Sequence, residues 1–321
     1  MRKFGWSIAL LLWVPLFAWS QAYQYPAKPI KLYVGFAPGG GTDITARIIA
    51  PKLGEVLGQT VLVENRAGAG GNIATDTLAK SPPDCYTIML SSVGPLTLSP
   101  HMSKLPYDPF KDVVPLSLGV NFSNVLVVNP SVKASTVTEF VALAKDPKAH
   151  ITYGSSGIGS SGHLAGELFK MMAKVDIQHI AYRGGGPAMT DLIGGSVPAL
   201  FATSPTVLGQ LHAGKIRALA VTSPKRSAAL PNVPTIAESG FPGYEATNWY
   251  AFIAPANTPR EIVAKLNAAI VKTLNDPAVH EKLKEQGMEA QPSTPEEMTA
   301  FMKKEYEIWG KVVKQADIRA E

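Results

Sequence analysis

Cysteine is almost absent from this chain, and its scarcity limits both disulfide formation and thiol catalysis. Cys85 is the single cysteine among 321 residues, so an internal disulfide is excluded. A catalytic thiol would need an activating base or a helix N-terminus, and the surrounding "PPDCYT" offers neither by sequence. We therefore expect Cys85 to be a turn or strand-entry residue.

Charge is also sparse and evenly spread. Charged residues make up 17% of the chain against 46% hydrophobic residues, and the formal net charge is +5. The hydrophobic share predicts a packed globular protein, and the lack of a basic block argues against nucleic-acid binding. We expect no cofactor. A metal site in particular is disfavoured, because the histidines at 101, 150, 163, 179, 212 and 280 show no paired spacing.

A long apolar run occurs once, at the N-terminus. Two basic residues precede an apolar segment from Ser7 to Trp19, and Ser20-Gln21-Ala22 follows it. This order predicts a secretory signal peptide over residues 1–22, cleaved after Ala22. A membrane anchor is the alternative, but the run is short for a bilayer and contains Pro15. We therefore expect an exported protein.

Apolar strands alternate with Gly/Ser-rich loops and amphipathic helices along the rest of the chain. Strands are expected at residues 30–36, 60–64, 87–90, 151–154, 177–182, 197–201 and 216–222. This alternation predicts an α/β fold with mainly parallel sheets and helices on both faces. Near the C-terminus, capping-box patterns at Thr258 and Thr294 predict helices over 259–274 and 295–314.

Two long extended segments divide the chain. "LSLGVNFSNVLVVNP" and "YEATNWYAFIAPANTP" are each long for one strand, so each is expected to cross from one lobe to another. The division assigns residues 23–121 plus 247–321 to lobe one and residues 122–246 to lobe two. We expect a ligand cleft between the lobes, faced by loops from both.

Glycine, serine and threonine gather in the loops after the predicted strands. Ligands of open α/β sheets bind beyond the carboxyl ends of the strands, and each loop here leads into a helix N-terminus that favours an anion. We expect Asp43 to cap its helix and to face away from that anion. The candidate ligand-binding residues are Phe36, Gly39, Gly40, Gly41, Thr42, Ser92, Ser155, Ser160, His163, Gly185 and Thr203.

The triple-glycine loop "GFAPGGGTDIT" also invites a nucleotide interpretation, which its residues disfavour. A P-loop requires a lysine that is missing here, and a dinucleotide fingerprint requires glycine where Ile44 stands. Serine hydrolysis is likewise disfavoured, because "GIGSSGH" falls one residue short of Gly-x-Ser-x-Gly. Three alternatives stay open: a tight turn without a ligand, a secreted enzyme acting on a small carboxylic acid with His163 as base, and a receptor that signals to a kinase.

Several segments, taken together and in order, resemble a known family. They are "YPAKPIKLYVGFAPGGGTDITARIIAPKL", "VENRAGAGGNIA", "SPPDCYT", "LPYDPFKDVVPL", "YGSSGIGSSGHLAGELF", "AYRGGGPAMTDLIGG", "IRALAVTS" and "NWYAFIAPANTP". Over nearly all of the chain after residue 22, the sequence resembles the periplasmic solute-binding component of tripartite tricarboxylate transporters, the Bug-type receptors.

The resemblance implies a fold and a function. It implies a type II-like periplasmic binding protein whose two α/β lobes close around a small carboxylate, held by backbone amides, hydroxyls and water. The loops at Gly39–Thr42, Ser155–His163 and Gly184–Ala188 match the family's binding loops. It further implies a non-enzymatic periplasmic receptor that delivers its ligand to a two-subunit membrane permease. We expect the receptor to be a monomer.

Two departures from the family pattern bear on that expectation. The family commonly has glycine where Cys85 stands, which raises the question of whether this turn needs a left-handed residue. The family often has Phe-Asp-Asn where this chain has Phe201-Ala202-Thr203. Because the acid that could meet an amine or hydroxyl is missing, we expect a dicarboxylate or an aromatic carboxylate as ligand, and not an amino acid.

Overall fold

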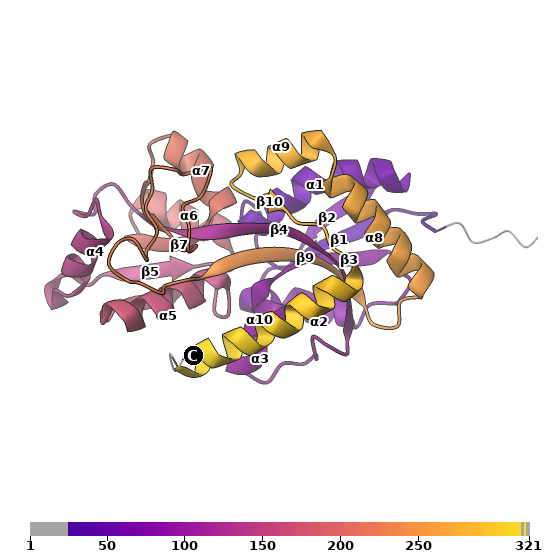
Figure 1. Cartoon of the computed structure of the whole chain (residues 1–321), viewed down its shortest axis with the longest axis horizontal. Coiled ribbons are helices and arrows are strands. Elements are labelled where there is room, and N and C mark those ends of the chain that lie inside the picture. The colour runs from indigo at the N-terminus through magenta and orange to yellow at the C-terminus, as the bar shows by residue number, and fades with distance from the viewer. Residues whose placement is uncertain (1–24, 316–317, 319–321) are drawn as a thin grey trace, which may run out of the picture.

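The structure is a computed structural model that describes residues 25–315 and 318, and it divides into two halves joined by long strands (Figure 1). We call the half that carries β1 to β3 lobe one and the half that carries β5 to β8 lobe two. The predicted signal peptide, residues 1–22, lies outside the described residues. Within the described part of the chain, no helix has both the length and the apolar character needed to cross a membrane.

Lobe one begins with a parallel sheet. Its elements are β1 (Ile30–Val34), α1 (Gly41–Leu57), β2 (Val61–Asn65), α2 (Asn72–Ala79), β3 (Thr87–Ser92) and α3 (Ser99–Met102), with short turns of helix at Ala69–Gly71 and Gly94–Leu98. β1 pairs in parallel with β2 on one side and β3 on the other. The loops after β1 and β3 therefore leave the same edge of the sheet, as parallel order requires.

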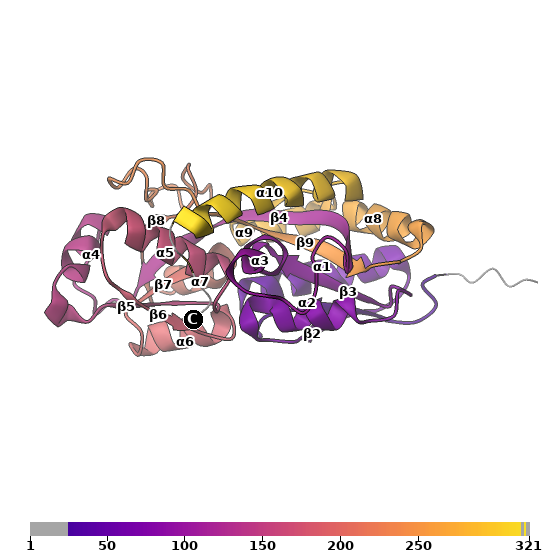
Figure 2. The same ribbon diagram turned by 90° about the horizontal axis from the view of Figure 1, so that it is seen from below.

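Two crossover strands connect the lobes. β4 (Val113–Val128) and β9 (Thr247–Pro255) run antiparallel to each other along the long axis of the molecule (Figure 2). β4 pairs with β9 as far as Ser123 and with β7 from Asn124 onward. One strand thus belongs to the sheets of both lobes, and its change of partner fixes where the lobes meet.

Lobe two repeats the strand–loop–helix scheme. Its elements are α4 (Val137–Ala144), β5 (Thr152–Ser155), α5 (Ser161–Ala173), β6 (Gln178–Ala181), α6 (Gly185–Gly194), β7 (Ala199–Thr203), α7 (Ser204–His212) and β8 (Arg217–Val221), with a 3₁₀ turn at Pro147–Ala149. β5 pairs in parallel with β6 and β7, so the loops after all three strands leave one edge.

The C-terminal elements return to lobe one. They are α8 (Arg260–Leu274), α9 (Pro277–Glu285), β10 (Glu289–Ala290) and α10 (Pro295–Gln315). α10 lies along the crossover strands (Figure 2), where Glu305 accepts hydrogen bonds from the indole nitrogens of Trp249 at 3.0 Å and Trp309 at 2.9 Å. The last helix therefore braces the connection between the lobes.

The sequence placed the main strands and C-terminal helices well, with differences at their ends. The capping box at Thr294 is confirmed, because Thr294 and Glu297 exchange side-chain hydrogen bonds with each other's backbone N–H groups. The one at Thr258 is wrong: its hydroxyl donates to the Pro255 carbonyl, and Pro259 occupies the N-cap position. Helices α4 and α9 were not expected, since α4 is short and the α9 segment is mostly polar.

Candidate functional site

A small cavity lies where the loops of the two lobes meet. Its volume is about 20 Å³, the size of a water site. Lobe one contributes the loop after β1 and the end of β3, and lobe two contributes the loops after β5, β6 and β7. The crossover strand β9 contributes two residues near its start. The lining residues are Phe36, Gly40, Gly41, Thr42, Ser92, Ser156, Ser160, Ser161, Gly185, Thr203, Asn248 and Tyr250.

Most of the residues chosen from the sequence come together at this cavity, and three do not. Gly39 donates its N–H to the Asp43 carboxylate, and Ser155 and His163 lie behind Ser160, buried in lobe two. Ser156 and Ser161 also line the cavity; they belong to the predicted loop Ser155–His163 but not to the candidate residues. Asn248 and Tyr250 line it from outside every predicted loop. The pattern of "NWYAFIAP" predicts only a crossover strand, although a polar residue and a tyrosine in such a strand are a usable signal of a binding wall.

Four helices start at the cavity. α1 begins with the lining residues Gly41 and Thr42, and α5 begins next to Ser160, which is its N-cap. α6 begins at Gly185, and Thr203 is the N-cap position of α7. Free N–H groups and the positive ends of four helix dipoles therefore point toward one small volume. Of the described residues that line it, none carries a charged side chain.

The triple-glycine loop is held by Asp43, which faces away from the cavity. The buried Asp43 carboxylate accepts hydrogen bonds from the Gly39 N–H at 3.0 Å, Asn65 Nδ2 at 2.9 Å and Arg47 Nε at 3.0 Å. Burial alone would raise the pKa of Asp43, but these bonds and the Arg47 charge hold it below its ordinary value. Asp43 is therefore not the N-cap that was expected. The helix begins at Gly41 with Gly40 as its N-cap, and Asp43 reaches back from the first turn to the Gly39 N–H.

Hydroxyl groups from both lobes meet on one wall of the cavity. The buried Tyr250 hydroxyl lies between Thr42 of lobe one and Thr203 of lobe two; burial raises its pKa above the ordinary range, and hydrogen bonds with the two threonines oppose that rise. The hydroxyl of Thr203 is also 2.8 Å from that of Thr206. This wall can donate hydrogen bonds without bringing a net charge.

A polar cluster joins the crossovers to the second lobe. The amide Nδ2 of Asn248 donates to Ser161 Oγ at 2.6 Å, and the Asn124 side-chain oxygen accepts from the same serine at 3.3 Å. Asn124 and Asn248 stand on β4 and β9, and Ser161 opens α5. The place where the sheet changes partners is therefore tied directly to a loop that lines the cavity.

The lobes touch at the rim of the cavity through glycines. The Ala37 N–H donates to the Arg183 carbonyl at 3.0 Å. Beside this bond, a methyl group on Gly186 would collide with the Pro38 carbonyl oxygen. On the other side, a methyl group on Gly94 would lie 2.5 Å from the Gly159 carbonyl oxygen. We call these backbone-to-backbone approaches the closure contacts, because each joins one lobe to the other.

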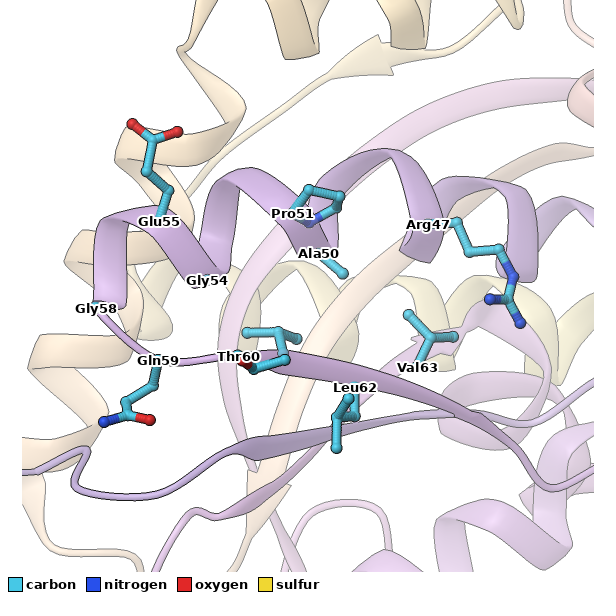
Figure 3. A pocket seen from close by; sticks show the side chains of 11 residues that line it. Arg47, Ala50, Pro51, Gly54, Glu55, Gly58, Gln59, Thr60, Leu62 and Val63 are labelled. Carbon is cyan, nitrogen blue, oxygen red and sulfur yellow. The ribbon is translucent and has the colours of Figure 1, made fainter.

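Larger hollows lie away from these loops, and two of them exceed 800 Å³. One, of about 860 Å³, lies between α1 and β2 and is lined entirely by lobe one, including Pro51, Gln59 and Leu62 (Figure 3). The other, of about 880 Å³, lies between α7 of lobe two and α9 of lobe one. Neither gathers the helix N-termini, so size alone does not identify the binding site here.

Cys85 occupies a strained backbone position. Its φ of 56° is left-handed, a conformation that glycine adopts without steric cost. The side chain is buried, with Sγ 3.1 Å from the Thr258 hydroxyl, and burial raises the pKa of the thiol to about 11. The turn does require a left-handed residue. Within residues 25–315 and 318, no group of His, Cys, Asp or Glu side chains could hold a metal ion.

Comparison with known proteins decides the family. The profile described as "TctC: Tripartite tricarboxylate transporter family receptor" matches residues 45–318. The chain belongs to this receptor family. BugT of Bordetella pertussis is 41% identical, with 92% of this chain and 91% of BugT covered.

Solved structures agree with that assignment. "R. palustris Rpa4515 with adipate" is 37% identical with a TM-score of 0.89, covering 92% of this receptor and 99% of that chain. "MatC (Rpa3494) from Rhodopseudomonas palustris with bound malate" is 30% identical with a TM-score of 0.86, covering 90% and 100%. The periplasmic-binding-protein fold expected from the sequence is thus confirmed.

Family membership makes this receptor a solute-binding protein and not an enzyme. The interpretation of His163 as a catalytic base is therefore wrong. The geometry gives a physical reason, because His163 is buried, does not line the cavity, and uses Nδ1 to accept a hydrogen bond from the Gly159 N–H at 3.3 Å.

Proposed function

We propose that this receptor captures a small dicarboxylate or aromatic carboxylate in the periplasm and delivers it to a two-subunit membrane permease. The observation that carries the proposal is the convergence of four helix N-termini on a cavity whose described lining has hydroxyls, an amide and backbone N–H groups but no charged side chain. Such a site stabilises an anion by directed donors and helix dipoles.

The ligand class rests on two further supports. The acid that the family pattern often carries after Phe201 is replaced here by Ala202 and Thr203, so an amine on the ligand would lack a counter-charge. The two relatives named above were solved with adipate and malate. Both are dicarboxylates, which agrees with a site for carboxylates that carry no amine.

Ligand entry requires the lobes to part, since the cavity is small and its rim is closed by backbone contacts. In this proposal the two lobes, residues 23–121 with 247–321 and residues 122–246, move as bodies about β4 and β9. A carboxylate that contacts Thr42 from one side and Ser160 from the other stabilises the closed form, because it binds that form more tightly.

A thermal-shift screen against a panel of mono-, di- and aromatic carboxylates tests the proposal. A ligand at a hundred times its Kd stabilises the native state by about 2.7 kcal/mol, which moves the unfolding midpoint measurably. Titration calorimetry should then give one site per chain for the best ligand. Tight binding of aspartate or glutamate would contradict the ligand class.

Two substitutions test the placement of the site. Thr42→Val and Ser160→Ala should each weaken binding about tenfold, because each removes a donor to a desolvated carboxylate. Thr77→Val is the matched control, since the Thr77 hydroxyl bonds to the Ile73 carbonyl of its own helix and lies outside the cavity lining. Unchanged affinity in both site variants would place the ligand elsewhere.

A further inference from the structure

A chain of hydrogen bonds runs from the cavity into the interior of lobe two. Ser160, which lines the cavity, lies 3.3 Å from Ser155 Oγ. Ser155 Oγ in turn lies 2.7 Å from Nε2 of His179. We call these three side chains the Ser–Ser–His relay. Its inner two members do not line the cavity, and Ser160 is the member of the relay that can contact a ligand.

The fold brings His179 to Ser155 by strand register. β5 and β6 are parallel, and Tyr153 stands opposite His179. Ser155 follows two residues after Tyr153, so its side chain leaves the same face of the sheet. The His179 ring packs between Tyr153, at a centroid distance of 4.9 Å, and His163 from α5, at 4.4 Å. This packing fixes the ring in place.

Ser155 has more polar neighbours than it can satisfy at once. A serine hydroxyl has one proton to donate and two lone pairs that accept. One lone pair takes the Gly157 N–H at 3.1 Å. The Gly157 carbonyl at 3.2 Å, Ser160 and His179 then compete for the remaining lone pair and the single proton. The tautomer of His179 decides that competition.

The two tautomers have opposite consequences for the cavity. If His179 carries its proton on Nδ1, Ser155 donates to Nε2 and accepts the proton of Ser160, whose hydroxyl then turns away from the ligand. If Nε2 carries the proton, it fills the second lone pair of Ser155, and Ser155 donates to the Gly157 carbonyl. The Ser160 proton is then free to point into the cavity.

We propose that His179 is a positioning residue whose Nε2–H tautomer, acting through Ser155, directs the Ser160 hydroxyl toward the carboxylate ligand. This inference rests on the proposed function, since it assumes an anion at Ser160. Burial lowers the pKa of His179 to about 3, and the facing His163 and Lys170 contribute to the fall. The ring therefore stays neutral at physiological pH, and the relay works by exchange of tautomers.

Nitrogen NMR of the histidine rings tests the relay without any ligand, because protonated and unprotonated ring nitrogens have well-separated shifts. Ser160→Gly removes the competing hydroxyl and keeps an acceptable N-cap residue. The fraction of His179 protonated at Nε2 should be higher in Ser160→Gly than in the wild type. An identical tautomer ratio in the two free proteins would overturn the relay.

Calorimetric titration with adipate gives a second test. His179→Phe keeps a ring but loses the donor, and should weaken adipate binding about tenfold, the cost of one hydrogen bond to a charged group. His179→Gln supplies a donor amide and should remain within about threefold of the wild type. His101→Phe is a matched control, because His101 also packs on a tyrosine, Tyr306, but its Nε2 bonds to the Tyr306 carbonyl and not to the relay.

The double variant separates positioning from mere support of the fold. In a Ser160→Gly background, His179→Phe should cause no further loss of adipate affinity, because its effect passes through the missing hydroxyl. Additive losses would overturn the proposal. A wild-type chain that does not bind adipate would count against adipate as the ligand, and the NMR comparison would then decide the relay by itself.

Discussion

Gly186 offers a direct test of whether binding depends on closure of the lobes. It lies in the first turn of α6, and its φ is outside the left-handed region, so alanine fits the helix. A methyl group there would nevertheless lie under 3.0 Å from the Pro38 carbonyl oxygen of lobe one, whereas ordinary contact begins at 3.4 Å. Gly186→Ala should therefore destabilise the closed arrangement of the lobes without destabilising the open one.

The size of the effect follows from the nature of the clash. The obstacle is backbone on both sides, so it cannot turn away as a flexible side chain would, and overpacking of this kind costs about 1–3 kcal/mol. If closure is required for tight binding, affinity should fall about 5- to 150-fold. The open form has no such clash, and alanine in a helix adds about 0.4–1 kcal/mol of stability to the free protein.

Calorimetry with the best ligand of the carboxylate panel, together with thermal unfolding, measures both effects. Gly94→Ala is an independent variant on the opposite lobe. Its new methyl carbon would lie 2.5 Å from the Gly159 carbonyl oxygen, so it should also weaken binding. Gly194→Ala, in the same helix α6, meets no described atom within 4 Å and should leave affinity unchanged. Wild-type affinity in folded Gly186→Ala would refute the reasoning.

Four further outcomes are expected. Tyr250→Phe should weaken ligand binding about tenfold by calorimetry, because it removes a buried hydroxyl from the cavity wall. Thr203→Asp should weaken it at least about a hundredfold by placing a carboxylate beside the anion, whereas Thr190→Asp, at an exposed position, should not. The pKa of Asp43 is lowered in the folded protein, so the ionised carboxylate contributes its full stabilisation above about pH 4. This contribution is lost as the pH falls through the folded-state pKa. The free energies of unfolding of the wild type and Asp43→Asn, measured in urea, should therefore converge in acid. Cys85, with its pKa of about 11, should react with a thiol reagent at neutral pH only after unfolding, and rapid labelling of the native protein would contradict its burial.

The order of the elements and most of the cavity loops could be predicted, because they depend on local sequence patterns. Alternating apolar strands, glycine-rich loops and helix starts are signals within a few residues of each other, and they predicted the order of the elements and the loops at Gly40, Ser160 and Gly185. The missing lysine after the triple glycine was enough to disfavour a nucleotide phosphate. The question of a left-handed turn at Cys85 came instead from the resemblance, because the family commonly has glycine at that position.

The structure differs from the expectations where distant segments decide. Ser155 and His163 look like ligand donors because they sit in the right loop, yet strand register and helix packing direct them to the interior. Tyr250 and Asn248 line the cavity although they are more than 40 residues from any residue chosen as a ligand donor, because β9 crosses between the lobes. The Thr258 cap failed for a similar reason, since its hydroxyl donates to the end of β9.

By itself, then, the sequence determined the fold class, the neutral character of the binding loops and the helix starts that favour an anion, since these depend on backbone propensities and nearby residues. The tertiary structure alone decided which donors share one cavity, that Asn65 of β2 donates to the Asp43 carboxylate, and which glycines let two backbones touch. Those properties depend on distances between residues far apart in the chain, and only the packed lobes and their crossover strands set these distances.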